Sequence, residues 1–220
     1  HQLAQQLPEE SGIDYHFSPI PILRPAFSED EEAELKLTAE RQRGLGLDLS
    51  WLSADDLRGL DTPVNGEARG AVVSHGEAQV DPYRLVLAFA QAVERLGGAI
   101  SYRTVTGLLR HGGRVTGVTL SSGDTLEARS VVLCLGPWSG EAQQWAGCPI
   151  PIQPLKGQLV RLQPSPSFAS HAIFHGGNYV LPKPAGYILA GTTEELVGFD
   201  TQVTQEAQER IMRQALRLVP

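Results

Sequence analysis

One stretch of the sequence constrains the fold more than any other: DPYRLVLAFAQAVERLGG, Asp81 to Gly98, which runs directly into alternating β-branched residues. Asp81 is a typical N-cap residue, Pro82 occupies the first helical position, and Gly97 can end the helix. One face is apolar over its whole length (Leu85, Ala88, Phe89, Ala92, Val93 and Leu96). The pattern predicts an amphipathic helix that packs on a sheet, and the segments that follow are the expected sheet.

Three segments after this helix alternate in the manner of half-buried strands. They are AISYRTVT (99–106), RVTGVTL (114–120) and TLEARSVV (125–132), and glycine-containing turns separate them. This arrangement predicts a meander of antiparallel hairpins. The next stretch is VVLCLGPWSG, Val131 to Gly140. It predicts a buried strand over residues 131–135, and the glycine-containing turn after it indicates that the strand ends next to a bulky neighbouring group.

The rest of the chain supplies further helices and strands. Capping and apolar patterns predict helices over 29–43, 53–58 and from Thr204 onward, the last with Ala207, Ile211, Ala215 and Leu218 on its inner face. Strands are expected at 71–73, at 156–163, and in a hairpin formed by 175–182 and 187–193. The fold class is therefore predicted as α+β, a mostly antiparallel sheet with flanking helices.

Composition and charge limit the classes of molecule that the chain is expected to bind. Of the 220 residues, 41% are hydrophobic, and 18 basic residues are scattered among 25 acidic ones, which gives a formal charge of −7. Nucleic acid is therefore not expected as a partner, and a small molecule is. We expect no membrane span and a cytoplasmic location, since no apolar run approaches about 20 residues and the first residues do not resemble a secretion signal. Cys134 and Cys148 form no CxxC motif and are read as small hydrophobes.

Three familiar kinds of site are poorly supported. The only G-x-G, Gly44-Leu45-Gly46, follows a helix and lacks a third glycine, so it is read as a helix end. His171 and His175 are four residues apart, but in a segment typical of a strand and turn, so no metal site is expected. Ser139 lacks the G-x-S-x-G context of a hydrolase nucleophile.

Tyr179, in GGNYVLP, leaves two interpretations open. In a strand its side chain shares a face with Gly177 and Leu181, which leaves space beside the ring. The residue is either a half-buried aromatic on a sheet or a phenol that lines a ligand pocket.

The order of several motifs resembles a known family, the flavin-dependent amino-acid oxidases of the D-amino acid oxidase superfamily, in particular the branch of glycine oxidase, sarcosine oxidase and D-amino acid dehydrogenase. The motifs span nearly all of the chain: GIDY at Gly12, QVDPY at Gln79, GAISYRTV at Gly98, VVLCLGPWS at Val131, PLKGQ at Pro154, YVLPKPAG at Tyr179 and GTTEELVGFD at Gly191.

The resemblance implies FAD as cofactor and assigns roles to five residues. Val105, Leu135, Gly136 and Trp138 match positions beside the FAD dinucleotide, and Tyr179 matches an aromatic hydroxyl near the substrate carboxylate. Leu135 and Pro137 depart from the residues usual in that turn. No catalytic acid or base is assigned, and no metal is expected.

The resemblance also implies a division of the chain. Residues 1–78 and 141–220 would be the two parts of the substrate domain, and 79–140 part of the FAD-binding domain. The family's N-terminal G-x-G-x-x-G and C-terminal arginine segment have no match in the sequence. We therefore expect an internal fragment of a longer enzyme, inactive by itself and doubtful as an FAD binder.

The function expected from the resemblance is oxidation of a small amino acid or N-methyl amine, with a hydride passing from Cα to the flavin and an imine as product. Two alternatives remain. One is a non-catalytic binding or interaction module that keeps this fold without the flavin site. The other is an NAD(P)-linked reductase, against which the missing glycine loop counts equally.

Overall fold

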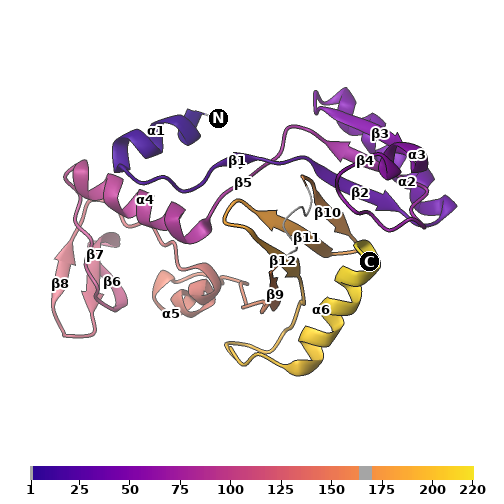
Figure 1. Ribbon diagram of the computed structural model, residues 1–220. Helices are drawn as coiled ribbons and strands as arrows, with labels where there is room; N and C mark the ends of the chain where they lie inside the picture. The colour runs from indigo at the N-terminus through magenta and orange to yellow at the C-terminus, as the bar shows by residue number, and fades with distance from the viewer. Residues whose placement is uncertain (1, 164–169) are drawn as a thin grey trace. The chain divides into compact units, whose positions relative to one another are not determined.

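The structure of the chain is a computed structural model that describes residues 2–163 and 170–220. It divides into two compact units (Figure 1). The first unit comprises residues 1–97, 157–193 and 202–220, and the second comprises residues 98–156 and 194–201. Each unit is described separately.

The first unit contains most of the secondary structure. Its helices are α1 (Gln2–Ser11), α2 (Glu29–Gly44), α3 (Ala54–Arg58), α4 (Pro82–Arg95) and α6 (Gln205–Leu218). Its strands are β1 (Ser18–Pro19), β2 (Ile22–Ala26), β3 (Leu49–Ser53), β4 (Gly70–Ser74), β5 (Ala78–Gln79), β9 (Leu159–Leu162), β10 (Ala172–His175), β11 (Asn178–Lys183) and β12 (Tyr187–Gly191).

A seven-stranded sheet is the centre of this unit, in the order β3-β4-β2-β10-β11-β12-β9. Within the described residues, its neighbours pair antiparallel except β2 and β10, which pair in parallel through Ile22↔Ala172 and Leu23↔Ile173. The predicted α+β class with a mostly antiparallel sheet is confirmed. So is the predicted hairpin around residues 183–186, although Gly176 and Gly177 form a turn, both at positive φ, instead of extending β11.

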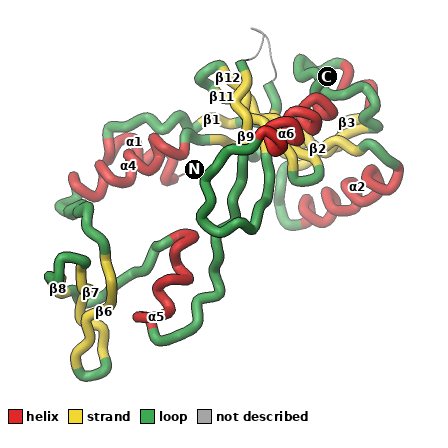
Figure 2. Tube along the Cα trace, turned by 90° about the horizontal axis from the view of Figure 1, so that it is seen from below, coloured by secondary structure: helices red, strands yellow, loops and turns green. Residues whose placement is uncertain are grey.

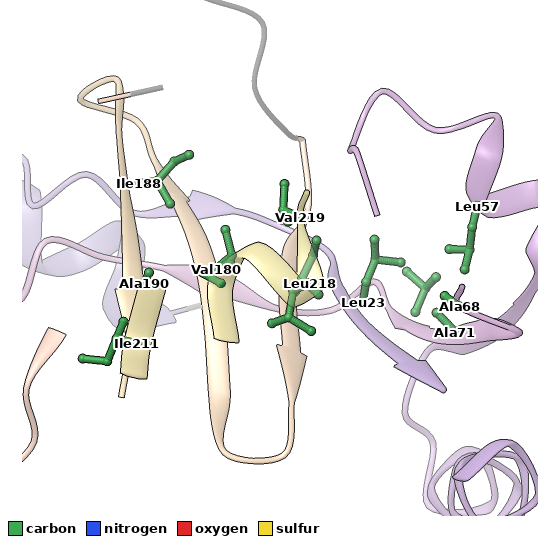
Figure 3. Packing of buried hydrophobic residues seen from close by; sticks show 13 residues of the cluster. Leu23, Leu57, Ala68, Ala71, Val180, Ile188, Ala190, Ile211, Leu218 and Val219 are labelled. Atoms are coloured by element: carbon green, nitrogen blue, oxygen red, sulfur yellow. The ribbon is translucent and has the colours of Figure 1, made fainter. Parts of the chain in front are cut away.

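Helix α6 covers one face of this sheet (Figure 3). Thr204 caps the helix, and the four residues predicted for its inner face are all buried. Three of them, Ile211, Ala215 and Leu218, share one core cluster with Ile173, Val180, Ile188 and Ala190 from the central strands and with Leu23 and Val73 from the other half of the sheet. One apolar core therefore joins strands that are far apart in the sequence.

Helix α2 packs on the opposite face, at the β3-β4 end. Residues alternate in direction along a strand, so Val72 points away from the core that holds Val73. Val72 and Leu49 are buried there against Ala39 of the helix, with Leu35 and Trp51 alongside. The helix covers only part of this face, because its contacts are with β2, β3 and β4.

The helix predicted from Asp81 forms as expected. α4 lies beside α1 (Figure 2), and its buried residues Ala88 and Ala92 pack with Leu7 of α1 and with Tyr15. Among the described residues of the first unit, α4 packs mainly on α1 and not on the seven-stranded sheet, and Phe89 and Val93 are 43% and 45% exposed. The small side chains of Ala88 and Ala92 allow α4 and α1 to approach closely. The sequence had suggested that the bulky Phe89 and Val93 would also be buried.

The second unit holds a three-stranded antiparallel sheet of β6 (Val105–His111), β7 (Arg114–Leu120) and β8 (Thr125–Glu127), followed by the 3-10 helix η1 (Gly136–Ala142) and α5 (Gln143–Ala146). The predicted meander is therefore present but shorter than expected. Residues 99–104 and 128–132 are not strands.

The predicted buried strand over residues 131–135 is also wrong. The segment has no strand assignment, and Val132 and Leu133 are 81% and 37% exposed. Cys134 and Cys148, read from the sequence as small hydrophobes, are exposed. A strand requires a neighbour to complete its hydrogen bonds, and within the described residues the sheet of this unit ends at β8.

The unit boundaries differ from the predicted domain boundaries. α4, predicted to belong with the meander, lies in the first unit, and residues 141–156, predicted to belong to the substrate domain, lie in the second. Among the described residues, no helix is long and apolar enough to cross a membrane.

Candidate functional site

Tyr179 lies on the sheet face opposite α6. It is the second residue of β11 and pairs with Phe174 of β10 across the Gly176-Gly177 turn. The two rings are stacked, with centroids 5.3 Å apart. Their strand neighbours Ile173 and Val180 point into the core, so the two aromatic rings must point away from it.

Glycine at position 191 makes room for the Tyr179 ring. Gly191 of β12 is the direct cross-strand partner of Tyr179. A Cβ at residue 191 would lie 2.8 Å from both Cζ and the hydroxyl oxygen of Tyr179. The ring therefore lies across β12, where any side chain at residue 191 would displace it. This glycine, in the GTTEE motif, was not predicted as a site residue.

The hydroxyl of Tyr179 is available. It has no hydrogen-bond partner among residues 2–163 and 170–220. Its oxygen atom is not fully buried, so a ligand can reach it. Partial burial raises the pKa of this phenol above its usual value, so the group is protonated at neutral pH. A protonated phenol can donate a hydrogen bond to an anionic ligand.

A buried polar network fixes the end of β12. Gln158, 6% exposed, donates its backbone N–H to the Thr193 hydroxyl (2.9 Å). Its side-chain oxygen accepts a hydrogen bond from the Thr204 N–H (2.9 Å), and its amide nitrogen donates to the Thr204 hydroxyl (3.3 Å). The network joins the PLKGQ and GTTEE motifs to the start of α6, so these motifs support the face that carries Tyr179.

Lys183 follows Tyr179 on the same side of β11, and sequence reasoning missed it. Its ammonium group donates to the Val80 carbonyl oxygen (2.8 Å), and burial lowers the pKa of Lys183 while the Asp81 carboxylate opposes that change. Gln79 donates to the carbonyl oxygen of Pro182 in the same way (2.9 Å). The QVDPY motif is thus joined to the YVLPKPAG motif.

The four residues that the resemblance places beside FAD all lie in the second unit. Leu135, Gly136 and Trp138 share one turn, in which the Trp138 N–H donates to the Leu135 carbonyl oxygen (3.0 Å). Gly136 has φ +52° and begins η1. Trp138 is 54% exposed and stacks on Phe199, with centroids 5.4 Å apart. Val105 is on a different element, at the start of β6, where it pairs with Leu120.

The groups that the sequence left aside have structural partners. The imidazole of His171 lies 3.0 Å from the Thr62 hydroxyl, and burial lowers its pKa. His175 lies 3.2 Å from Glu31. The Ser139 hydroxyl donates to the Gly136 carbonyl oxygen (2.7 Å). In the described part of the chain, no cluster of three or more His, Cys, Asp or Glu residues could hold a metal ion.

Residues 1–220 match the family model described as DAO, FAD dependent oxidoreductase, so the chain belongs to this family of FAD-dependent oxidoreductases. Curated relatives that match over the whole chain include two from Pseudomonas species. Glycine oxidase of Pseudomonas putida is 32% identical over 224 residues, and subunit HcnC of the hydrogen cyanide synthase of Pseudomonas aeruginosa is 31% identical over 229 residues. The predicted resemblance is confirmed.

The fold likeness agrees with the sequence likeness. The solved structure of glycine oxidase from Bacillus cereus superposes with a TM-score of 0.89 at 26% identity, over 100% of this chain and 60% of that one. The chain spans 53% and 59% of the two curated relatives named above. It therefore corresponds to somewhat more than half of a protein of that kind.

Proposed function

We propose that the chain forms the substrate-binding part, and some of the FAD-binding part, of an oxidoreductase that oxidises a small amino acid or N-methyl amine to an imine. The observation that carries this proposal is the sheet face with Tyr179. There a protonated, half-buried phenol with an available hydroxyl stacks on Phe174. The likeness to glycine oxidase, a protein whose name states a small amino acid, supports the substrate class.

On this proposal Tyr179 binds and orients the substrate. Its hydroxyl donates a hydrogen bond to the substrate carboxylate, and the stacked Phe174 ring holds the phenol in place. Gly191 keeps the ring flat against the sheet because a side chain there would push it outward.

FAD, when bound, supplies the acceptor for the hydride that leaves Cα of the substrate. We propose that Val105, Leu135, Gly136 and Trp138 contact it. The turn that contains Leu135, Gly136 and Trp138 is suited to a flat aromatic group. Nothing lies within 4 Å of the position that a Cβ would take at Gly136, and the Trp138 ring is more than half exposed.

The roles of the two units follow from these assignments. We propose that the first unit binds substrate and that the second unit contributes to FAD binding, with α4 now grouped with the first unit. The cytoplasmic location expected from the sequence remains part of this proposal. The small-molecule partner is the amino acid or amine.

The test uses the complete polypeptide that contains this sequence, purified and assayed for flavin absorbance and for flavin reduction by glycine and sarcosine. We expect a yellow protein whose flavin either substrate bleaches. Tyr179→Phe should raise the apparent substrate Kd about tenfold, the effect of one lost hydrogen bond to a charged group. Tyr102→Phe is the matched control, because Tyr102 is fully exposed and lies in the second unit.

The competing function, a binding module without flavin, gives a different result. A complete polypeptide that stays colourless with excess FAD would refute the oxidoreductase proposal. Equal substrate affinity in Tyr179→Phe and wild type would refute the role of Tyr179 alone. For the proposed cofactor residues, Trp138→Ala should weaken FAD binding. Trp138→Phe should retain most of the FAD affinity, because it keeps an aromatic ring at the proposed contact.

A further inference from the structure

A cavity lies on the sheet face that carries Tyr179, between α2 and the β10-β11 hairpin. Its volume is about 550 Å³, within the range of small-molecule sites. Arg24 of β2 lines it from the sheet, Glu34 and Thr38 from α2, and Phe174 and Asn178 from the hairpin. All these residues belong to the first unit. The cavity uses neither Tyr179 nor any residue assigned to FAD.

Arg24 is the cationic group of this cavity. Its neighbour Leu23 is fully buried in the core below the sheet, so the alternation of the strand directs Arg24 to the opposite face. The side chain is half-buried, and the described residues offer it neither a hydrogen bond nor an ion pair. A guanidinium group has five N–H donors in a fork that matches a carboxylate. Arg24 is therefore poised to bind an anionic group.

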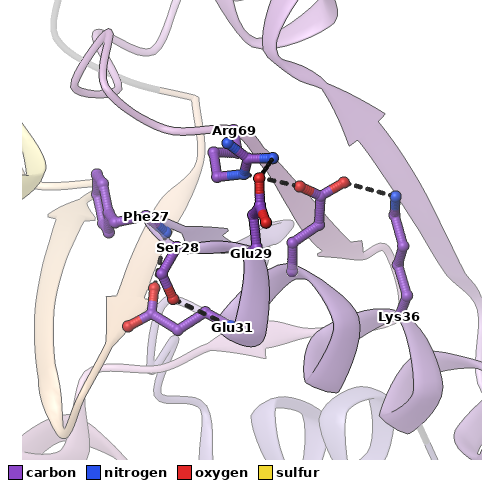
Figure 4. A network of polar contacts seen from close by, with 7 residues as sticks. Phe27, Ser28, Glu29, Glu31, Lys36 and Arg69 are labelled. Carbon is purple, nitrogen blue, oxygen red and sulfur yellow. Dashed lines mark hydrogen bonds and ion pairs between the residues drawn. The ribbon is translucent and has the colours of Figure 1, made fainter.

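Glu31, although it lines the cavity, is already engaged. Its carboxylate accepts a hydrogen bond from the Phe27 N–H (2.7 Å) and lies 3.2 Å from His175. The Ser28 hydroxyl accepts from the Glu31 N–H in the same helix cap (Figure 4). The hydrogen bond from Phe27, aided by His175, holds the pKa of Glu31 below its usual value, so it carries a negative charge.

Glu34 is the second available charge. It lies nearly one helical turn beyond Glu31, it is exposed, and no ion pair or hydrogen bond joins it to Arg24 or to any other described residue. Two carboxyl groups, those of Glu31 and Glu34, line the cavity against the one guanidinium group of Arg24. A simple anion is therefore disfavoured, whereas a molecule with both a carboxylate and an ammonium group would meet a partner for each.

We propose that this cavity binds a small zwitterion of the α-amino acid class, with its carboxylate on Arg24 and its ammonium group on Glu34. The Phe174 ring provides the apolar wall, and its stacking on Tyr179 brings the site next to the proposed catalytic face. Binding at this site requires no flavin. The proposal therefore goes beyond the proposed function and can fail or succeed independently of it.

The experiment titrates the 220-residue chain, without FAD, with glycine, acetate and methylamine, and follows the backbone amide resonances of Gly176, Gly177 and Asn178 by NMR. We expect saturable shifts with glycine, and binding at least tenfold weaker with acetate or methylamine, because each has only one of the two charges. Arg24→Gln and Glu34→Gln should each weaken glycine binding about tenfold or more.

Matched controls lie on the same helix outside the cavity. Arg41→Gln and Glu40→Gln should bind glycine as the wild type does, since both side chains are exposed and neither lines the cavity. Arg24→Lys, which keeps the charge but not the fork, should bind more tightly than Arg24→Gln.

Three results would overturn the proposal. One is the absence of saturable shifts with glycine. Another is unaltered glycine binding in a folded Arg24→Gln or Glu34→Gln variant, with folding verified by circular dichroism. The third is acetate or methylamine binding as tightly as glycine, which would make the site one for a simple anion or cation.

Discussion

Replacing Gly191 with alanine tests how the sheet holds Tyr179. The φ angle of Gly191 is not positive, so alanine is compatible with the backbone at this residue. Its Cβ would lie 2.8 Å from Cζ and from the hydroxyl oxygen of Tyr179, where ordinary contact begins at 3.4 Å. The ring must therefore move away from β12 and from its stacked position on Phe174.

The expected cost follows from the size of this overlap. Overpacking of a well-packed site by one methyl group lowers the free energy of unfolding by about 1–3 kcal/mol. Urea denaturation monitored by circular dichroism measures it. In the complete enzyme, the same substitution should also weaken substrate binding, because the phenol hydroxyl no longer lies where the carboxylate binds.

A double-mutant cycle shows whether the Tyr179 ring is the cause. When Tyr179 is first replaced by alanine, the added Gly191→Ala substitution should cost less than about 0.5 kcal/mol, since the atoms it would contact are gone. Gly76→Ala is the control, because nothing lies within 4 Å of its Cβ position and its φ is not positive. An undiminished cost in the Tyr179→Ala background would refute the reasoning.

Three further predictions concern the same unit. Because burial raises the pKa of Tyr179, its contribution to stability is fully present below the unfolded-state pKa of about 10 and is lost as pH rises through the folded-state pKa; an alkaline absorbance titration should lose its latest phenolate step in Tyr179→Phe. Gln158→Leu should lower the free energy of unfolding by about 1–3 kcal/mol, because the two hydrogen bonds between the buried Gln158 side chain and Thr204 are lost; Glu206→Gln, in the exposed first turn of α6, should change it little. Asp81→Ala should cost about 1 kcal/mol through loss of the bond from the Arg84 N–H (3.1 Å), and Asp81→Asn should retain most of it.

Local signals predicted the elements whose stability is local. The caps at Ser28, Ser53, Asp81 and Thr204 are all present as side-chain hydrogen bonds, and the apolar stripe of α6 is the buried stripe. A cap and an amphipathic face are properties of neighbouring residues, so the sequence contains them directly.

Elements whose packing depends on distant residues were predicted less well. α1 was not expected, and Pro8 within it argues against a helix, yet Leu7 is buried against Tyr15 and Ala88. The strands β2 and β3 were also missed, since their partners become evident only when β4 is placed between them. The segment 131–135 reads as a strand by composition, but composition does not supply a neighbouring strand.

The candidate site shows the same division. The alternation of β11 indicated that Tyr179 has open space on its side, but not that Gly191, twelve residues later, provides it. Nor could it indicate the stacking on Phe174, which depends on the register across the Gly176-Gly177 turn. Arg24 and Glu34 carried no motif at all, and only the packing of α2 beside the hairpin brings them to one cavity.

The parallel pairing of β2 with β10 has a consequence for synthesis. Leu23 pairs beside Ile173, which follows about 150 residues later and leaves the ribosome roughly 8–30 s after it. During that interval β2 is an uncovered edge, open to strands of other nascent chains. Pro25 has no N–H to offer such a strand, so we expect Pro25→Val to increase the insoluble fraction during expression. An unchanged soluble yield would show that the proline does not protect this edge.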